Sequence, residues 1–374
     1  MKIGINTRFL LSNKMEGFGW YTYEVVKRIV QNHPEHSFVL FFDRPVDPKF
    51  HFGENATEVV IGPPARHPFL YLIWFEFSLR KAMKKHKIDL LFSPDGSLSL
   101  FSNIPQIHVI HDLNFEHFPA DLPWLFRWYY RTFFPKFAAK SIKIITVSSS
   151  SKCDISETYG VDESKIAVAW NGASECFFPI SKLDKDQFLS QNGLGDYFVF
   201  VGSIHPRKNV QRLINAFTKF QKENNFPKID LVIVGQPMWK GQRIEIQESM
   251  NSKIRFTGHL SQEELGKYVS SAFAMTYVPY FEGFGIPLVE AMRCGIPILS
   301  GDRTSLPEIA GDAAIYCDPF DEDQITDGMK NLFLDGDLRA RLSENGLNRS
   351  KLFSWDQTAE EVWKVISTEI QQLS

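Results

Sequence analysis

The stretch that most constrains the fold is residues 273–301, in which two apolar segments are joined by a glycine-rich loop and a short helical segment. Residues 273–278 are mainly apolar, as expected for a buried strand, and residues 296–299 predict a second strand. Pro287 is typical of the first turn of a helix, and Gly295 is typical of a helix end. The stretch therefore predicts a strand, a helix and another strand, as in layered α/β sheets.

The same alternation extends over the whole chain. It predicts two α/β domains with parallel, doubly wound sheets, whose ligands bind at the carboxyl ends of the strands. A polar segment at 171–196 predicts a linker between them. The first half has predicted strands at 2–6, 38–42, 58–61, 88–92, 106–111, 143–147 and 165–169 and helices at 21–31, 69–85 and 125–140; the second half has strands at 197–201, 230–234 and 254–257 and helices at 210–223, 243–250, 262–270 and 355–371.

Composition excludes several classes of protein. A length of 374 residues suits two domains, and 44% hydrophobic with 23% charged residues is typical of a globular protein in water. The formal charge of −3 gives no general attraction to nucleic acid. Four cysteines without a Cys-x-x-Cys spacing, and a first strand in place of a signal peptide, predict a cytoplasmic protein with reduced thiols.

Two loops predict a site for a phosphorylated ligand. Residues 282–285 (Glu-Gly-Phe-Gly) precede a helix N-terminus, which binds anions well. Arg207 and Lys208 follow the first strand of the second half, where adjacent cations at a helix start favour a bound phosphate. Carboxylates such as Glu282 and Glu290 do not bind phosphate, and they would accept hydrogen bonds from the hydroxyl groups of a sugar or ribose.

The run from Phe281 to Ile298, with Glu282 and Glu290 separated by seven residues, resembles the Glu-x7-Glu signature of retaining glycosyltransferases of family 4. The resemblance implies the GT-B fold, in which two Rossmann-like parallel-sheet domains face each other across a cleft. It assigns residues 1–172 to an acceptor-side domain and residues 173–354 to a nucleotide-sugar-binding domain. The terminal helix, residues 355–374, is expected to pack back on the first domain.

The resemblance also assigns roles to other residues. Gly202 and the run Pro206–Asn209 resemble the family's donor-phosphate site, although Ser203 stands where many relatives have arginine. Residues 15–22 resemble its first glycine loop, and His111-Asp112 a pair near the transferred sugar; a plain tight turn and a structural histidine are the alternatives. The catalytic candidates are His111, Arg207, Lys208 and Glu282, and the donor-binding candidates are Gly17, Gly19, Gly202, Ser203, Gly258, His259, Gly283, Phe284, Gly285 and Glu290.

The expected activity is transfer of a hexose from a nucleoside-diphosphate sugar to a glycan or lipid-linked acceptor, in cell-surface polysaccharide biosynthesis. Similarity to bacterial mannosyltransferases favours mannose from GDP-mannose. A sugar-nucleotide epimerase and a catalytically silent glycan-binding or scaffold protein are the alternatives. We expect no cofactor and no metal, because the family manages without one and the Asp-x-Asp pairs lie where aspartate caps helices: Asp184/Asp186, Asp321/Asp323 and Asp335/Asp337.

Two basic, aromatic segments, residues 69–87 and 123–140, suggest contact with an anionic membrane. The alternative is that these helices bury their aromatic side chains and leave their cations in water. The expected location is therefore the cytoplasm, with peripheral attachment to the inner face of the membrane as an option.

Overall fold

The computed structural model describes residues 1–12, 15, 17–223, 229–237, 244–247, 250 and 253–373. It divides into two compact units, of which unit 1 comprises residues 1–171 with 355–374, and unit 2 comprises residues 172–354. The sequence-based boundary was placed after residue 172, with the terminal helix assigned to the first domain.

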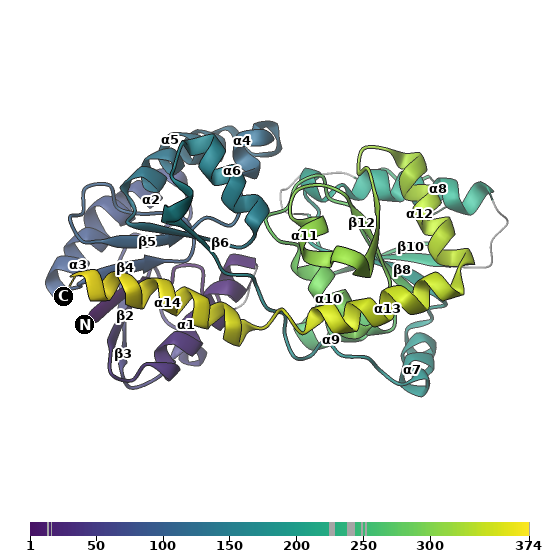
Figure 1. The fold of residues 1–374 in the computed structure, drawn as a ribbon, viewed down its shortest axis with the longest axis horizontal. Helices are drawn as coiled ribbons and strands as arrows, with labels where there is room; N and C mark the ends of the chain where they lie inside the picture. Colours follow the sequence, from purple (N-terminus) through teal and green to yellow (C-terminus); the bar gives the residue numbers. More distant parts are fainter. Residues whose placement is uncertain are drawn as a thin grey trace. The chain divides into compact units, whose positions relative to one another are not determined.

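Unit 1 is built on a seven-stranded parallel sheet in the order β3-β2-β1-β4-β5-β6-β7 (Figure 1). The strand order changes direction between β1 and β4, where Ile5 pairs with Phe92. This point is the switch point of the sheet, where ligands of α/β proteins bind. The strands are β1 (Lys2–Asn6), β2 (Ser37–Phe42), β3 (Ala56–Val60), β4 (Leu90–Ser93), β5 (Gln106–Val109), β6 (Lys143–Thr146) and β7 (Ile166–Val168).

Helices cover this sheet, and the terminal helix α14 lies beside α1 (Figure 1). The Trp363 ring of α14 stacks on His33 with ring centroids 3.8 Å apart, and Trp355 meets Tyr21 of α1 edge-on. The helices of unit 1 are α1 (Gly17–Asn32), α2 (Pro68–Ile73), the π-helical η2 (Trp74–Leu79), α3 (Arg80–His86), α4 (Asn114–His117), α5 (Trp124–Lys140), α6 (Ser149–Tyr159) and α14 (Trp355–Leu373), with short 3-10 turns η1 (Pro48–Phe50), η3 (Pro119–Asp121) and η4 (Glu163–Lys165).

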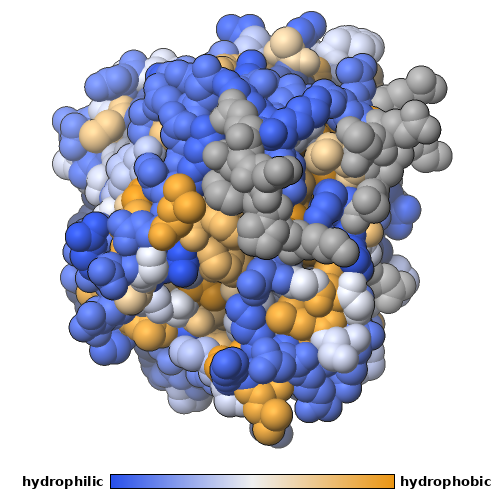
Figure 2. Space-filling model, turned by 90° about the vertical axis from the view of Figure 1, so that its right-hand side faces the viewer, coloured by the Kyte–Doolittle hydropathy of each residue, from blue (hydrophilic) through white to orange (hydrophobic). Residues whose placement is uncertain are grey.

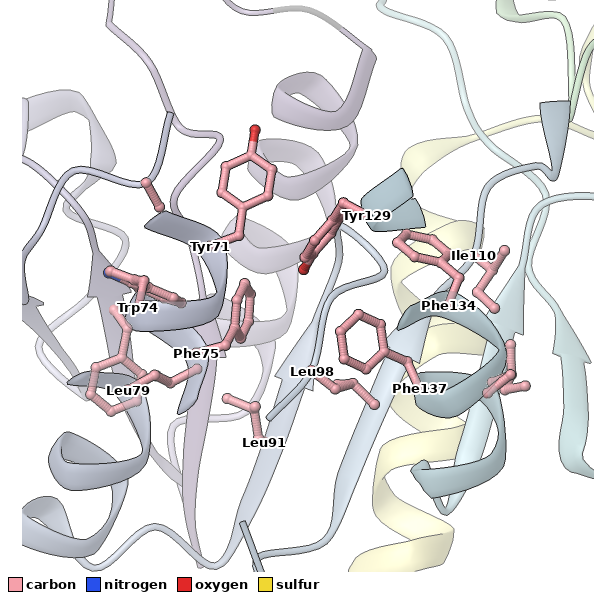
Figure 3. Close-up of a cluster of buried hydrophobic side chains, with 14 of the residues drawn as sticks. Tyr71, Trp74, Phe75, Leu79, Leu91, Leu98, Ile110, Tyr129, Phe134 and Phe137 are labelled. Atoms are coloured by element: carbon pink, nitrogen blue, oxygen red, sulfur yellow. The ribbon is translucent and has the colours of Figure 1, made fainter. Parts of the chain in front are cut away.

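The core of unit 1 lies between the sheet and the helices α2, η2 and α5 (Figure 3). Trp74 and Phe75 of η2 and Tyr129 and Phe137 of α5 are fully buried in it. Each large aromatic side chain removes much apolar surface from water, so the burial of these rings holds the helices against the sheet.

Unit 2 has a six-stranded parallel sheet in the order β10-β9-β8-β11-β12-β13. Its switch point lies between β8 and β11, where Phe198 pairs with Ala274. The strands are β8 (Tyr197–Val201), β9 (Asp230–Val234), β10 (Ile254–Gly258), β11 (Ala274–Tyr277), β12 (Ile298–Gly301) and β13 (Ala314–Cys317). The helices are α7 (Lys182–Asn192), η5 (Pro206–Lys208), α8 (Val210–Glu223), α9 (Gln262–Ser270), α10 (Ile286–Cys294), α11 (Leu306–Ala310), η7 (Gly311–Ala313), α12 (Glu322–Leu334) and α13 (Gly336–Ser350).

The prediction of two α/β units with parallel sheets is confirmed, but the helices α6, α7, α12 and α13 and the strand β13 were not predicted. The segment interpreted as a linker contains the helix α7, which Ser181 caps by accepting a hydrogen bond from the Asp184 amide. This helix buries none of its residues, so no apolar periodicity marked it. The helix predicted at 243–250 lies largely outside the described residues.

The surface on the unit 2 side of Figure 1 is mainly hydrophilic with separate apolar patches (Figure 2). Within the described part of the chain, no helix is both long and apolar enough to cross a membrane.

Candidate active site

The switch point of unit 2 brings together the two loops that the sequence singled out. The β8 loop passes through His205, which caps the 3-10 turn η5, and the β11 loop leads to Gly285, the N-cap of α10. Gly285 has a φ of 95°, a left-handed conformation that glycine adopts readily. Pro287 lies in the first turn of α10 and Gly295 forms its C-cap, so both expected helix signals are confirmed.

Arg207 and Lys208 of the β8 loop both bind Glu282 of the β11 loop. Nη1 of Arg207 lies 2.9 Å from Oε2 of Glu282, and Nζ of Lys208 binds Oε1. Lys208 also donates to the hydroxyl of Tyr277 at 2.8 Å, and this hydroxyl donates to Oε1 of Glu282 at 3.0 Å. One carboxylate is thus shared by two cations.

The electrostatics of this group follow from burial and close charges. Burial alone would raise the pKa of Glu282, but the charges of Arg207 and Lys208 hold it below its ordinary value. The pKa of Tyr277 is raised by burial and by the neighbouring carboxylate. Glu282 is therefore ionised at neutral pH, and Tyr277 remains a phenol that can donate a hydrogen bond.

Three polar side chains hold the two loops in place. Asn209, with a φ of 61°, donates to the carbonyl groups of Val278 at 3.0 Å and Pro319 at 2.6 Å. Oγ1 of Thr304 accepts from the Glu282 amide at 3.1 Å, and Ser305 donates to the Glu282 carbonyl at 3.0 Å. These contacts join the loops that follow β8, β11, β12 and β13.

Glu290 differs sharply from Glu282. It lies in the middle of α10 and is 8% exposed, and its Oε2 has no hydrogen-bond partner among the described residues. Burial raises its pKa to about 8, against the opposing influence of the Lys208 charge. A buried carboxyl oxygen without a partner is costly, so a polar ligand at this position would compensate it.

Two of the donor-binding candidates, Gly258 and His259, lie at the end of β10 and directly after it. The Gly235 amide donates to the Gly258 carbonyl at 3.0 Å, and a Cβ placed on Gly235 would lie 1.9 Å from the carbonyl oxygen of Gly202. Gly235 therefore permits the β8, β9 and β10 ends to approach each other, and the sequence analysis missed it. Ser203 is partly buried beside Gly202, and His259 is exposed.

The rest of the glycine loop packs against α10 and the segment before α14. Phe284 is buried and meets Phe353 edge-on with ring centroids 5.8 Å apart, and its carbonyl accepts a hydrogen bond from Ser305. Phe284 is thus a packing anchor, which fixes the position of Gly283 beside it.

In unit 1, the structure brings His111 to the start of α1, near the first glycine loop. The His111 ring lies 4.8 Å from the Phe18 ring and 4.7 Å from the Tyr21 ring, and its Nε2 is 2.9 Å from the Pro94 carbonyl. Burial lowers its pKa, which favours the neutral imidazole at pH 7. A Cβ on Gly19 would meet the Phe9 carbonyl at 2.8 Å, whereas one on Gly17 would meet nothing within 4 Å.

Of the Asp-x-Asp pairs, two have a clear local role. Asp321 caps α12 by accepting from the amides of Asp323 and Gln324, and Asp335 caps α13 by accepting from the Leu338 amide. Asp184 bonds the capping residue of α7, Ser181. No group of metal-binding side chains occurs among the residues that the structure describes.

The predicted residues therefore form two groups, one in each unit. Arg207 and Lys208 both bind Glu282, and the Lys208 charge acts on the nearby Glu290. The backbone at Gly202 is joined to that at Gly258 through Gly235. In unit 1, His111 and the helix that Gly17 and Gly19 open form the second group.

Comparison with known proteins agrees with this architecture. Residues 15–175 match the family model described as Glycosyltransferase Family 4, and residues 182–349 match the model described as Glycosyl transferases group 1. Together the two matches span most of the chain.

Two curated relatives are O-antigen chain mannosyltransferases. RfbU of Salmonella typhimurium is 27% identical over 268 residues, which are 70% of this chain and 70% of that protein. Mannosyltransferase B of Escherichia coli is 30% identical over 219 residues, 57% of each. Among solved structures, Anabaena HepE in complex with UDP-glucose has a TM-score of 0.77 at 16% identity, covering 98% of this chain and 100% of that one, which shows a shared fold. The chain belongs to the GT-B glycosyltransferases, with a family 4 domain followed by a group 1 domain.

Proposed function

We propose that this protein transfers mannose from GDP-mannose to a glycan or lipid-linked acceptor, with retention of anomeric configuration and without a metal ion. The observation that carries the proposal is the pair of cations, Arg207 and Lys208, held by one carboxylate at a sheet switch point. Such cations can neutralise the diphosphate that leaves as the sugar bond breaks. The O-antigen mannosyltransferase relatives support mannose and a role in cell-surface polysaccharide biosynthesis.

Glu282 forms ion pairs with Arg207 and Lys208 when no donor is bound, and the donor diphosphate replaces its carboxylate on these cations. The electrostatic free-energy cost of this exchange is small, because one anion takes the place of another beside the same cations. The released carboxylate then accepts hydrogen bonds from the sugar hydroxyls and positions the anomeric carbon. In this scheme Glu282 acts first as a substitute anion and then as a sugar ligand.

The other candidates take complementary roles. Glu290 supplies its unpartnered oxygen to the ribose hydroxyls, and the backbone amides of Gly283 and Gly285 face the departing phosphate. The ends of β8 and β10 at Gly202, Ser203, Gly258 and His259 border the nucleoside. Within unit 1, Gly17, Gly19 and the neutral imidazole of His111 form a separate group that takes part in substrate binding.

The reaction that suits these groups is attack by an acceptor hydroxyl on the same face from which the diphosphate departs. The C–O bond to the diphosphate breaks, the new C–O bond forms, and the departing phosphate oxygen takes the hydroxyl proton. Arg207 and Lys208 stabilise the negative charge that develops on this oxygen. In this proposal no side chain of the protein acts as a nucleophile.

A nucleotide-sugar screen tests the proposal. Thermal unfolding should be measured with GDP-mannose, GDP, UDP-glucose and UDP, since a ligand at 100 times its Kd stabilises the folded state by about 2.7 kcal/mol. GDP-mannose and GDP should raise the midpoint, and Lys208→Ala should reduce both shifts. Transfer to an acceptor, followed by NMR of the anomeric proton, then reports retention. If the donor is converted to an epimeric sugar nucleotide in the absence of acceptor, the enzyme is an epimerase. If no nucleotide raises the unfolding midpoint, the proposal is contradicted.

We also propose that unit 1 attaches to an anionic membrane through α2, η2 and α3. Phe69, Ile73 and Phe77 are 53%, 43% and 71% exposed, on the side opposite the buried Trp74 and Phe75. An exposed apolar stripe beside cations suits the interface of an anionic bilayer. The cations that follow it, all exposed, are Arg80, Lys81, Lys84, Lys85 and Lys87.

Flotation with vesicles tests this attachment. The protein should float with vesicles that contain phosphatidylglycerol and not with pure phosphatidylcholine vesicles, and the binding should weaken at high salt. Phe77→Ser should reduce binding, whereas Leu334→Ser, at a 70% exposed position in unit 2, should not. Equal binding of both variants would contradict the assigned surface.

A further inference from the structure

A pocket lined by three arginines lies at the carboxyl ends of β1, β2 and β3, within unit 1. It has a volume of about 510 Å³ and is lined in part by Arg8, Arg44, Arg66 and Tyr71. Each arginine follows a different strand of the sheet, so the fold assembles a group that is dispersed in the sequence. None of the sequence motifs described above includes these arginines.

Arg8 is the central residue of this pocket. It is 4% exposed and its Nε binds Asp95, which follows β4, so the ion pair spans the switch point between β1 and β4. Its Nη2 donates to the Ser97 hydroxyl at 3.3 Å, and its guanidinium lies 4.3 Å from the Tyr71 ring centre. Among the described residues, its Nη1 has no hydrogen-bond partner.

A buried guanidinium nitrogen without a partner is unfavourable, and a ligand oxygen would satisfy it. A structural brace between β1 and β4 would explain the contact with Asp95, but it would not explain the unsatisfied Nη1. The geometry of guanidinium matches the oxygens of phosphate, which it can bind through two parallel N–H groups.

The charge balance also favours an anion. Asp95 pairs with Arg8, and Asp43 pairs with Arg44 through contacts of 2.5 and 2.7 Å. Arg66 is exposed, and no carboxylate pairs with it among the residues that the structure describes. The pocket therefore keeps one positive charge beyond its internal ion pairs.

We propose that this pocket binds a phosphate group carried by the acceptor, so that the enzyme uses a phosphorylated or diphosphate-linked acceptor. The substrate assignment rests on the proposed glycosyltransferase function, whereas anion binding by the pocket does not. The phosphate would contact Arg8, Arg44 and Arg66 in unit 1, separately from the donor diphosphate on Arg207 and Lys208 in unit 2.

The first experiment measures binding of inorganic pyrophosphate by calorimetry, at constant ionic strength set with chloride. The full chain should bind at two sites, and Lys208→Ala should retain the one in unit 1. In the Lys208→Ala background, Arg66→Ala should weaken the remaining affinity about tenfold, because it removes a charged contact. Arg341→Ala, which removes an exposed arginine of α13, is the matched control. If Arg66→Ala behaves like Arg341→Ala, the pocket is not an anion site.

The second experiment identifies the source of the phosphate. Transfer should be compared between one acceptor glycan with a phosphate at its reducing end and the same glycan without it. Arg66→Ala should raise KM for the phosphorylated glycan about tenfold, with kcat and the KM for the other glycan nearly unchanged. Inorganic pyrophosphate should compete with the phosphorylated acceptor in the wild-type protein.

The two proposals can fail separately. Absence of transfer to either glycan, with pyrophosphate binding lost in Arg66→Ala, would contradict the proposed function and leave the pocket as an anion site. Transfer with an unchanged KM in Arg66→Ala would overturn the acceptor assignment. Arg44→Gln gives an independent check on pyrophosphate binding at this pocket. Arg44 is at the pocket surface, so its replacement does not break the buried Arg8–Asp95 pair.

Discussion

The switch points of the two sheets each hold a cation paired with a carboxylate, but the ratio of cations to carboxylates differs. In unit 1, Arg8 after β1 binds Asp95 after β4; in unit 2, Lys208 after β8 binds Glu282 after β11. Arg8 has its own carboxylate, whereas Lys208 shares one with Arg207. The carboxyl ends of parallel strands at a switch point leave room for a ligand, and buried cations there need an anion from the protein until one arrives.

The two groups differ in how readily a ligand can displace the carboxylate from its cations. Glu282 lies on a glycine-rich loop and serves two cations, so its replacement by a diphosphate leaves both cations neutralised. Asp95 also accepts from the Ser97 amide at 3.0 Å, which ties it to its own loop. We therefore expect exchange of the carboxylate in unit 2 and addition of a ligand beside the intact pair in unit 1.

The largest expected effect comes from removing a cation in unit 2. Lys208→Ala should lower kcat by about a hundredfold or more, equivalent to about 2.7 kcal/mol of transition-state stabilisation, because the leaving diphosphate loses a charged contact. Steady-state kinetics would measure it, with Lys267→Ala on the exposed side of α9 as the control. Activity within threefold of wild type would remove Lys208 from the proposed mechanism.

The next comparison separates the two glutamates of unit 2. Glu282→Gln should lower kcat about a hundredfold, because the sugar is misplaced, while free GDP binds at least as tightly as before because its competitor has lost its charge. Glu290→Gln should mainly weaken binding of the donor and of GDP. Calorimetric titration beside kinetics measures both effects. The opposite pattern of GDP affinities would reverse the two roles.

A third prediction concerns pH and stability. The pKa of Glu290 is raised to about 8 in the folded protein, so the folded state holds a proton that the unfolded state releases near its ordinary value of 4.5. Its contribution to stability is complete below about pH 4.5 and is lost as the pH rises through 8, by at most about 1.4 kcal/mol per pH unit. Urea unfolding should show a smaller decline between pH 5 and 8 in Glu290→Gln than in wild type. Parallel declines would show that Glu290 is ionised.

The smallest expected effect is that of metal removal. If Arg207 and Lys208 supply the charge that a metal supplies elsewhere, excess EDTA should leave the transfer rate largely unchanged. The assay should include a second sample to which Mg²⁺ or Mn²⁺ is restored. A rate abolished by EDTA and recovered with either ion would contradict the proposed metal-independent mechanism.

Much of the fold and part of the candidate site followed from local sequence. Apolar segments and their spacing predicted the strands, and Pro287 and Gly295 marked the ends of α10, because these effects depend on neighbouring residues. Arg207 with Lys208, and Glu282 with Glu290, stand close together in the chain and formed recognisable patterns. The helix α7 escaped prediction because it has no buried face.

The pairing of these groups depends on tertiary packing and could not be predicted from the sequence. That Glu282 binds both cations, that Glu290 is buried with an unsatisfied oxygen, and that Gly235 meets Gly202 all depend on the packing of separate strands. The same holds for Arg8, Arg44 and Arg66, which lie up to 58 positions apart in the sequence. Strand order brings them to one edge of the sheet, because parallel strands align their carboxyl ends whatever their separation along the chain.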